Sequence, residues 1–340
     1  MKNKLINFET FGIRSVDSVK QQIDLACSQG YTSIIGLLLA DGFLYNDYND
    51  IVEYTKSKGV DIKIIAGMSY KNSLDCEVIE FNFNLHTVYN SYKNATLSNY
   101  TSSNKFLFLG GVPDRLNRIG LLHKIYKKDL LKYGEWSFFA PWTEEQEKYC
   151  KAFFTSNDEY KEFISFVERK IDNLYDNSKH YGTDFAVTDW TNNSSWIDPT
   201  IFKNAGLSVI SEGHPGDDNT NSAFLTEKTY RVFVQGHPFL FAGNPSMFEY
   251  IKELGFKTFE NYFPHTDYAT VTNENERLDL LVDNLSYFVY NKSDYSKDVE
   301  YNRNHFFNLA KQNCKILRTL DADKKEIDFY FDRKGFGHLI

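Results

Sequence analysis

Two basic residues lie one helical turn apart in the segment 225–236, LTEKTYRVFVQG. The pattern predicts a helix that opens at Thr226-Glu227-Lys228, followed after Gly236 by an apolar strand. Free backbone N–H groups, the positive end of the helix dipole, Lys228 and Arg231 would then converge on one point, which suits a phosphate or diphosphate. Glu227 can accept hydrogen bonds from paired ribose hydroxyls. The segment therefore predicts a nucleotide-sugar site.

Carboxylates and a histidine follow several apolar strands, where the active sites of α/β proteins collect. Glu212 and His214 follow an apolar strand that begins at residue 207, and Glu9 and Asp41 follow two strands near the N-terminus. Transfer to a hydroxyl acceptor by inversion needs a general base, for which Glu9 or Asp41 is our best candidate. A lone histidine is more often a structural hydrogen-bond donor than a catalyst.

Arg115 and Arg118 are three residues apart near the start of a helix expected at 116–132. Their side chains can reach a common anion, so both are candidate contacts for the donor phosphates, although a solvated basic face explains them equally well. The preceding turn, Gly110-Gly111-Val112-Pro113, lacks the G-x-G-x-x-G spacing of dinucleotide sites and contains a proline. A bound NAD is not expected.

The first hundred residues alternate between strand and helix patterns. Alternation of this kind implies a parallel sheet covered by helices. The expected strands are 5–8, 33–39, 61–66 and 76–81, and the expected helices are 18–28 and 49–58.

The segment 91–104 is rich in Ser, Asn and Thr and has no apolar periodicity, so it is predicted to link two domains. Strand and helix patterns then restart. The predicted division is an acceptor-side domain over 1–100, a nucleotide-sugar domain over 101–300, and a C-terminal helix and tail over 301–340. The apolar positions of 299–317 suit a helix that returns to pack on the first domain.

The run TEKTYRVFVQGHPFLFAGNP (226–245) resembles the donor-site element of GT-B glycosyltransferases, particularly fucosyltransferase-like families. The longer block from Ser211-Glu212 to Phe259 also resembles poorly characterised glycosyltransferase-like proteins of phages. The resemblance implies an α/β, GT-B-like fold in which two Rossmann-like domains with parallel sheets face a cleft. It also implies that a Glu-Lys pair, here Glu227 and Lys228, opens the donor helix.

Composition limits the alternatives. A net charge of −8 argues against a protein that coats nucleic acid, and no segment reaches the ~20 apolar residues that a membrane span needs. Four separated cysteines have no metal-site spacing and are expected to be reduced. A cytoplasmic protein is predicted, in the host cytoplasm if the source is viral. No cofactor is expected, and dependence on a divalent metal stays undecided.

The resulting prediction is a glycosyltransferase that moves a sugar from a nucleotide-activated donor to a hydroxyl of a glycan, a small molecule or a modified DNA base. One alternative is a phage-type DNA glycosyltransferase that acts on a hydroxymethylated pyrimidine, which a basic groove would favour. Another alternative is a non-catalytic nucleotide- or glycan-binding module.

Overall fold

The computed structural model divides into two compact units, each of which contains a four-stranded parallel sheet. The first unit comprises Met1–Tyr89, Pro215–Leu225 and Asn308–Ile340, and the second comprises Asn90–His214 and Thr226–Phe307. Parallel sheets with intervening helices confirm the predicted α/β class. The structure describes residues 3–7, 16–38, 45–66, 69–70, 74–97, 99–111, 116–138, 148, 151, 154–175, 197, 199–212, 222–223 and 225–318.

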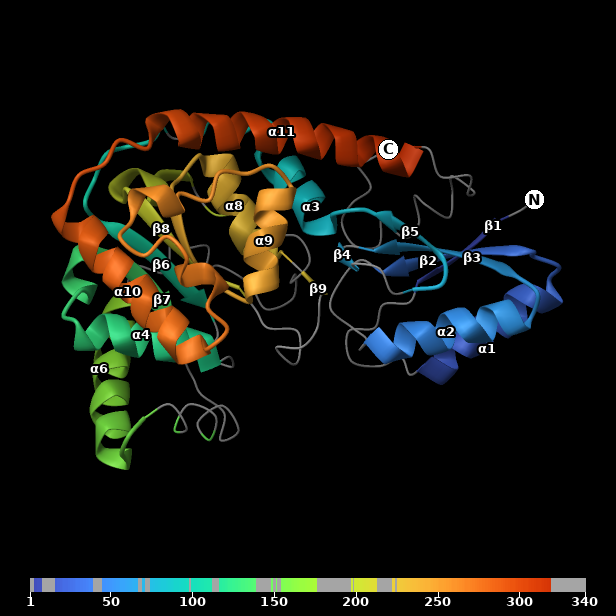
Figure 1. Ribbon diagram of the computed structural model, residues 1–340, viewed down its shortest axis with the longest axis horizontal. Coiled ribbons are helices and arrows are strands. Elements are labelled where there is room, and N and C mark those ends of the chain that lie inside the picture. Colours follow the sequence, from blue (N-terminus) through green and yellow to red (C-terminus); the bar gives the residue numbers. More distant parts are fainter. Residues whose placement is uncertain are drawn as a thin grey trace. The chain divides into compact units, whose positions relative to one another are not determined.

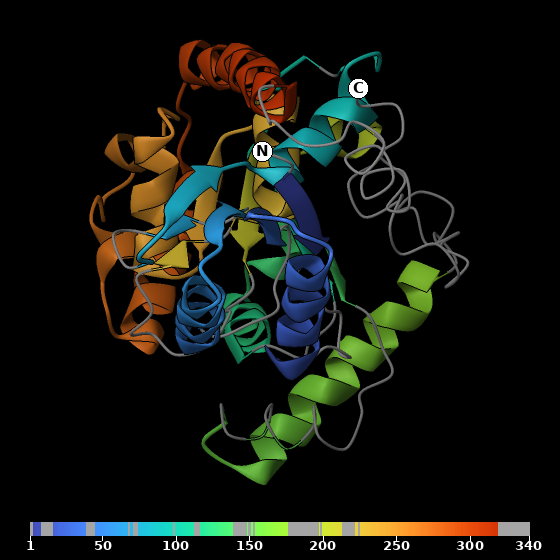
Figure 2. The same ribbon diagram turned by 90° about the vertical axis from the view of Figure 1, so that its right-hand side faces the viewer.

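The sheet of the first unit has the strand order β1-β2-β3-β5. Successive strands add in one direction, and right-handed crossovers therefore place the connecting helices on the same face. Figure 2 shows these two helices side by side in blue. The strands are β1 (Asn3–Asn7), β2 (Ser33–Leu38), β3 (Asp61–Ala66) and β5 (Glu77–Glu80), and the helices are α1 (Val16–Ser28) and α2 (Tyr45–Ser57). All six were predicted from the sequence.

Two further elements of this region were not anticipated. A short antiparallel pair joins β4 (Ser69–Tyr70) to β9 (Ser222–Ala223). Helix α3 (Phe83–Tyr92) begins at Asn82, whose side-chain oxygen accepts a hydrogen bond from the Leu85 N–H at 3.1 Å. The irregular segment expected at 91–104 therefore starts two residues later, and its described residues beyond α3 form neither helix nor strand.

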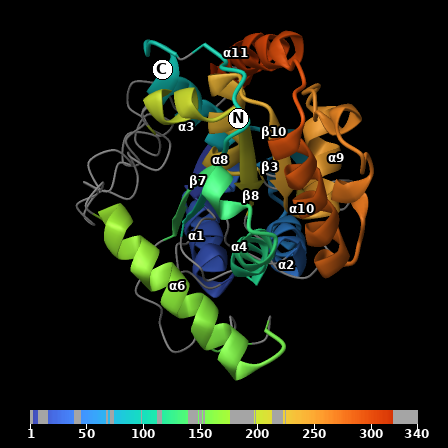
Figure 3. The same ribbon diagram turned by 90° about the vertical axis from the view of Figure 1, so that its left-hand side faces the viewer.

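The sheet of the second unit has the order β10-β8-β6-β7, so the crossovers from β6 to β7 and from β8 to β10 run in opposite directions. Helix α4 leads from β6 to β7 and helix α8 from β8 to β10, which places the two helices on opposite faces. Figure 1 shows α8 on one side of this sheet and α4 with α10 on the other, and Figure 3 shows α4 beside α10. The elements are β6 (Phe106–Gly111), α4 (Leu116–Lys127), β7 (Gly134–Phe138), β8 (Leu207–Ser211), α8 (Glu227–Gln235), β10 (Phe239–Ala242) and α10 (Glu274–Tyr290).

Helix α4 is shorter than the sequence suggested. It ends at Lys127, because Asp129 adopts a φ of 55° and Leu131–Tyr133 forms a separate 3₁₀ turn. The left-handed backbone at Asp129 cannot continue an α-helix. The remaining helices are α6 (Asn157–Tyr175), α9 (Pro245–Glu253) and α11 (Ser296–Arg318), and a 3₁₀ helix covers Pro199–Asn204.

Two neighbouring strands of the second sheet lie entirely in the interior. Every residue of β8 and β10 is buried, as expected for parallel strands with helices on both faces. Phe233 of α8 packs against Phe239 of β10 with ring centroids 5.5 Å apart. This packing fixes α8 against the sheet and so determines where its first turn lies.

Candidate functional site

The first turn of α8 forms the centre of the candidate site, and it begins where the sequence predicted. Thr226 is the N-cap, with extended backbone, and its hydroxyl oxygen accepts a hydrogen bond from the Lys228 N–H at 3.3 Å. An N-cap of this kind satisfies one of the otherwise free N–H groups of the first turn.

Glu212 lies directly after β8 and holds this first turn in place. Its carboxylate accepts hydrogen bonds from the Thr226 N–H at 3.0 Å and the Thr226 hydroxyl at 2.7 Å, and also from the Thr229 hydroxyl. The side chain is fully buried. The two oxygens of a carboxylate can accept several hydrogen bonds, so three donors around Glu212 make a well-matched contact. We therefore assign Glu212 a positioning role in this structure.

Glu227 forms an ion cluster with the two cations of α8. Its Oε1 lies 2.7 Å from Lys228 Nζ and 3.9 Å from Arg231 Nη2. Burial alone would raise the pKa of Glu227, but the charges of Lys228 and Arg231 outweigh it and lower the pKa to about 2. The carboxylate is thus ionised at neutral pH and holds both cations on one side of the helix.

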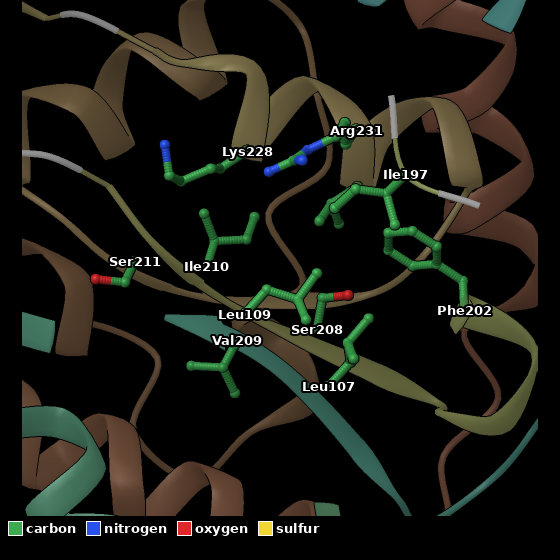
Figure 4. Close-up of a pocket in the computed structure, with 11 residues that line it drawn as sticks. Leu107, Leu109, Ile197, Phe202, Ser208, Val209, Ile210, Ser211, Lys228 and Arg231 are labelled. Atoms are coloured by element: carbon green, nitrogen blue, oxygen red, sulfur yellow. The ribbon is translucent and has the colours of Figure 1, made fainter. Parts of the chain in front are cut away.

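A small, partly open pocket lies between α8 and the sheet. Figure 4 shows Lys228 and Arg231 on one side of it, with Leu107 and Val209 opposite. The described residues that line it are Leu107, Leu109, Ile197, Phe202, Ser208, Val209, Ile210, Ser211, Lys228, Arg231 and Val232. Cations beside an apolar surface suit a ligand that has an anionic part and a flat or apolar part.

Two hydrogen bonds fix the pocket wall at Ile197. The Tyr92 hydroxyl donates to the Ile197 carbonyl and accepts from the Ile197 N–H, both at 2.7 Å. Tyr92 is itself fully buried. Neither Tyr92 nor Ile197 was predicted from the sequence, because a contact over 105 residues leaves no local pattern.

Ser211 is another pocket residue that was not predicted from the sequence. Its Oγ is buried and has no hydrogen-bond partner among the described residues. A buried hydroxyl without a partner costs about 1–3 kcal/mol, which a water or a ligand atom would recover. The signal available in the sequence was its position beside Glu212 at the end of a strand.

The site lies at the topological switch point of the second sheet. Strands β6 and β8 are neighbours, but their following helices leave to opposite faces, and ligands of open parallel sheets bind outside the strand ends at such a point. Arg118 stands in the first turn of α4, which follows β6, and its side chain is buried. Among the described residues that line the pocket, Arg118 does not occur.

Other predicted site residues cannot be placed. Glu9, Asp41, His214 and Arg115 all lie outside the residues that the structure describes. Of the predicted site residues, the structure brings Glu212, Glu227, Lys228 and Arg231 together around the first turn of α8.

His237 follows α8 and is a structural residue. Its Nδ1 lies 2.8 Å from the Ser208 hydroxyl, and its Nε2 lies 2.7 Å from the Ala205 carbonyl. A carbonyl only accepts, so Nε2 carries the proton and Nδ1 accepts from Ser208. Burial lowers the pKa of His237 to about 4, so the ring is neutral. This geometry agrees with the structural interpretation of a lone histidine.

Within the described ranges, no group of three or more His, Cys, Asp or Glu side chains is arranged to hold a metal ion. No described helix combines the length and the apolar character that crossing a bilayer requires. The chain matches no protein-family description, no curated protein and no solved structure. Support for a function therefore comes from the geometry and charges of the site.

Proposed function

We propose that the protein is a glycosyltransferase that uses a nucleotide sugar as donor. The observation that carries the proposal is the joint presence of Lys228 and Arg231 on one side of a pocket beside the first turn of α8. A diphosphate needs cations and free N–H groups at one point, and a nucleoside needs an adjoining surface of apolar character. The finer fold assignment that we propose is GT-B-like.

The proposed chemistry follows from the negative charge on the group that leaves the donor. Breaking the glycosidic bond releases a nucleoside phosphate, and cations placed in advance at a helix N-terminus stabilise the charge that develops. We assign this task to Lys228 and Arg231, with Arg118 and Arg115 as further candidates. Glu227 is the proposed acceptor for the ribose hydroxyls.

The acceptor hydroxyl must lose a proton if transfer proceeds with inversion. Glu9 and Asp41 remain the proposed general bases, in an acceptor-side domain over 1–100, while 101–300 would bind the donor. The C-terminal helix and tail, residues 301–340, are the third part of the proposed domain division. A DNA acceptor remains an alternative within the same reaction class.

A non-catalytic nucleotide-binding module is the second candidate, and one observation favours it. Glu212 already accepts three hydrogen bonds from α8 and its cap, so this strand-end carboxylate is engaged in holding the helix. A binding module would retain the donor affinity without transferring or hydrolysing the sugar.

A thermal-shift panel of UDP-, GDP-, CMP- and dTDP-sugars tests the proposal. A ligand present at 100 times its Kd stabilises the native state by about 2.7 kcal/mol, and one nucleotide class is expected to raise Tm clearly above the others. Parallel samples with EDTA, Mg²⁺ or Mn²⁺ decide the metal question. If no nucleotide or nucleotide sugar shifts Tm, the proposal is wrong. If binding occurs, release of free nucleotide with an acceptor library separates the transferase from the binding module.

A further inference from the structure

A cysteine and a histidine that are 228 residues apart in the chain lie in contact within the first unit. Cys314 Sγ, on α11, is 3.2 Å from His86 Nδ1, on α3. His86 is only 1% exposed, whereas Cys314 is partly accessible. Nucleophile and base within hydrogen-bond reach is the arrangement that activates a thiol.

Neighbouring contacts fix the geometry of this pair. The side chain of Asn313 accepts from the Asn82 N–H and donates to the Asn82 carbonyl, both at 2.9 Å. The ring of Phe81 packs against His86 with centroids 5.8 Å apart. Asn313 and Asn82 thus hold α11 in register with α3, and Phe81 limits the rotation of the imidazole.

We propose that Cys314 is a reactive thiol, with His86 as its general base, and that it takes small disulfides as reaction partners. In the reaction, His86 Nδ1 accepts the thiol proton while Cys314 Sγ attacks one sulfur of the disulfide. The S–S bond breaks, a mixed disulfide forms on Cys314, and the departing thiolate takes the proton from His86. The step exchanges one disulfide for another, so it needs no further oxidant. This site is independent of the proposed nucleotide site.

The other described cysteines provide internal controls. Cys27 and Cys76 are also free and partly accessible. Burial raises the pKa of the Cys76 thiol, and this effect outweighs the opposite effect of the Lys56 charge, which reduces the thiolate fraction of Cys76. All three thiols have intermediate exposure, and of the three only Cys314 is hydrogen-bonded to a histidine within the described part of the chain.

The test treats the reduced, full-length protein with oxidised glutathione at neutral pH and follows each cysteine by peptide mass mapping after an acid quench. Cys314 is expected to react at least about tenfold faster than Cys27 and Cys76, since a positioned general base contributes about 10²-fold or more. His86→Gln should remove this advantage and leave the other two rates unchanged. His265→Gln, which changes a half-exposed histidine of the second unit, should leave all three rates unchanged.

Two results would overturn the proposal. The first is a wild-type protein in which Cys314 reacts no faster than Cys76, and this comparison needs no variant to fold. The second is a folded His86→Gln protein, verified by circular dichroism, in which Cys314 retains its full rate.

Discussion

The two ends of helix α8 differ in the polar groups that surround them. At its N-terminus, Thr226, Lys228 and Arg231 gather hydroxyl, N–H and cationic groups beside a partly open pocket. At its C-terminus, Gly236 closes the helix with a φ of 60°, and His237 is buried and neutral between Ser208 and Ala205.

The two ends of α8 differ in the hydrogen-bond and ion-pair partners of their polar groups. At the C-terminal end, the Gly236 N–H and both ring nitrogens of His237 have partners inside the protein, so these groups contribute to stability. The N-terminal end uses internal partners for its cap, through Glu212, but also keeps two cations paired with one carboxylate on the pocket side. Lys228 and Arg231 both line the pocket, where an anionic ligand can interact with their charges. Each prediction below acts on one end of the helix.

The largest effect is expected from Glu212→Ala. Removal of the carboxylate would leave the Thr226 N–H and two threonine hydroxyls without their acceptor at a buried position. A cost of about 4 kcal/mol in the free energy of unfolding is expected, since each lost hydrogen bond costs about 1 kcal/mol and buried unpaired donors add to this. Urea denaturation measures the change.

A matched carboxylate provides the control for this prediction. Glu249 of α9 has a side chain that is 49% exposed and pairs with Lys252. Glu249→Ala should change the free energy of unfolding by less than about 0.5 kcal/mol, as is usual for surface positions. Equal losses in the two variants would contradict the anchoring role of Glu212.

The C-terminal end predicts a dependence of stability on pH. The pKa of His237 is about 4 in the folded protein and near the usual 6.5 in the unfolded chain, so the unfolded state binds more protons between these values. Stability contributed by neutral His237 is complete above pH 6.5 and falls as pH drops toward 4, by about 3 kcal/mol in total.

Unfolding curves at several pH values between 4 and 7 test this prediction. His237→Gln should flatten the slope in that window, whereas His265→Gln should retain it. The partly buried His123, whose pKa is also lowered by burial, contributes in the same direction and remains in both variants. An unchanged slope in His237→Gln would show that other groups cause the pH dependence.

The third prediction concerns ligand binding at the N-terminal end. Lys228→Ala should weaken nucleotide-sugar binding by about 1.5–3 kcal/mol, the range for hydrogen bonds to charged groups, with little change in folding. Calorimetric titration gives the Kd. Lys124→Ala is the matched control, because the side chains of Lys124 and Lys228 are 23% and 24% exposed and each pairs with one near carboxylate. Unchanged affinity in Lys228→Ala would exclude the phosphate contact.

Local patterns predicted most elements because each pattern is decided within a few residues. The helix at Thr226 was placed correctly from its cap and first-turn charges, and the six strands and helices of the first unit were found from alternation. Helix α3 was missed, although His86 and Tyr92 make contacts that matter. Its stability depends on packing against residues far away in the sequence, such as Asn313, which leaves no local signature.

The site was predictable in its charges and unpredictable in its hydrogen bonds. Lys228 and Arg231 were identified as one cluster, since one helical turn separates them. The sequence suggested chemistry for Glu212 because it follows a strand, but burial and contact with Thr226 depend on how the chain returns after β8. The partners of His237 likewise lie about 30 residues earlier, at Ala205 and Ser208.

The smallest predicted effect comes from Glu227→Gln, and it tests whether the internal carboxylate serves the ligand or only the helix. In the ligand-free protein Glu227 neutralises part of the charge of Lys228 and Arg231. Loss of that charge should leave pyrophosphate binding equal to or tighter than that of the parent. At the same time, a charge-assisted hydrogen bond to ribose would be weakened by about 1 kcal/mol.

Comparison of three ligands separates the two roles of Glu227. The parent should bind a ribonucleotide more tightly than its 2′-deoxy analogue, and Glu227→Gln should reduce this preference by about fivefold, which corresponds to the weaker hydrogen bond. Pyrophosphate has no ribose and reports the cations alone. If calorimetry gives the same ribose preference in both proteins, Glu227 acts only on the first turn of α8 and its cations. The N-terminal end would then differ from the C-terminal end in charge and not in ligand recognition.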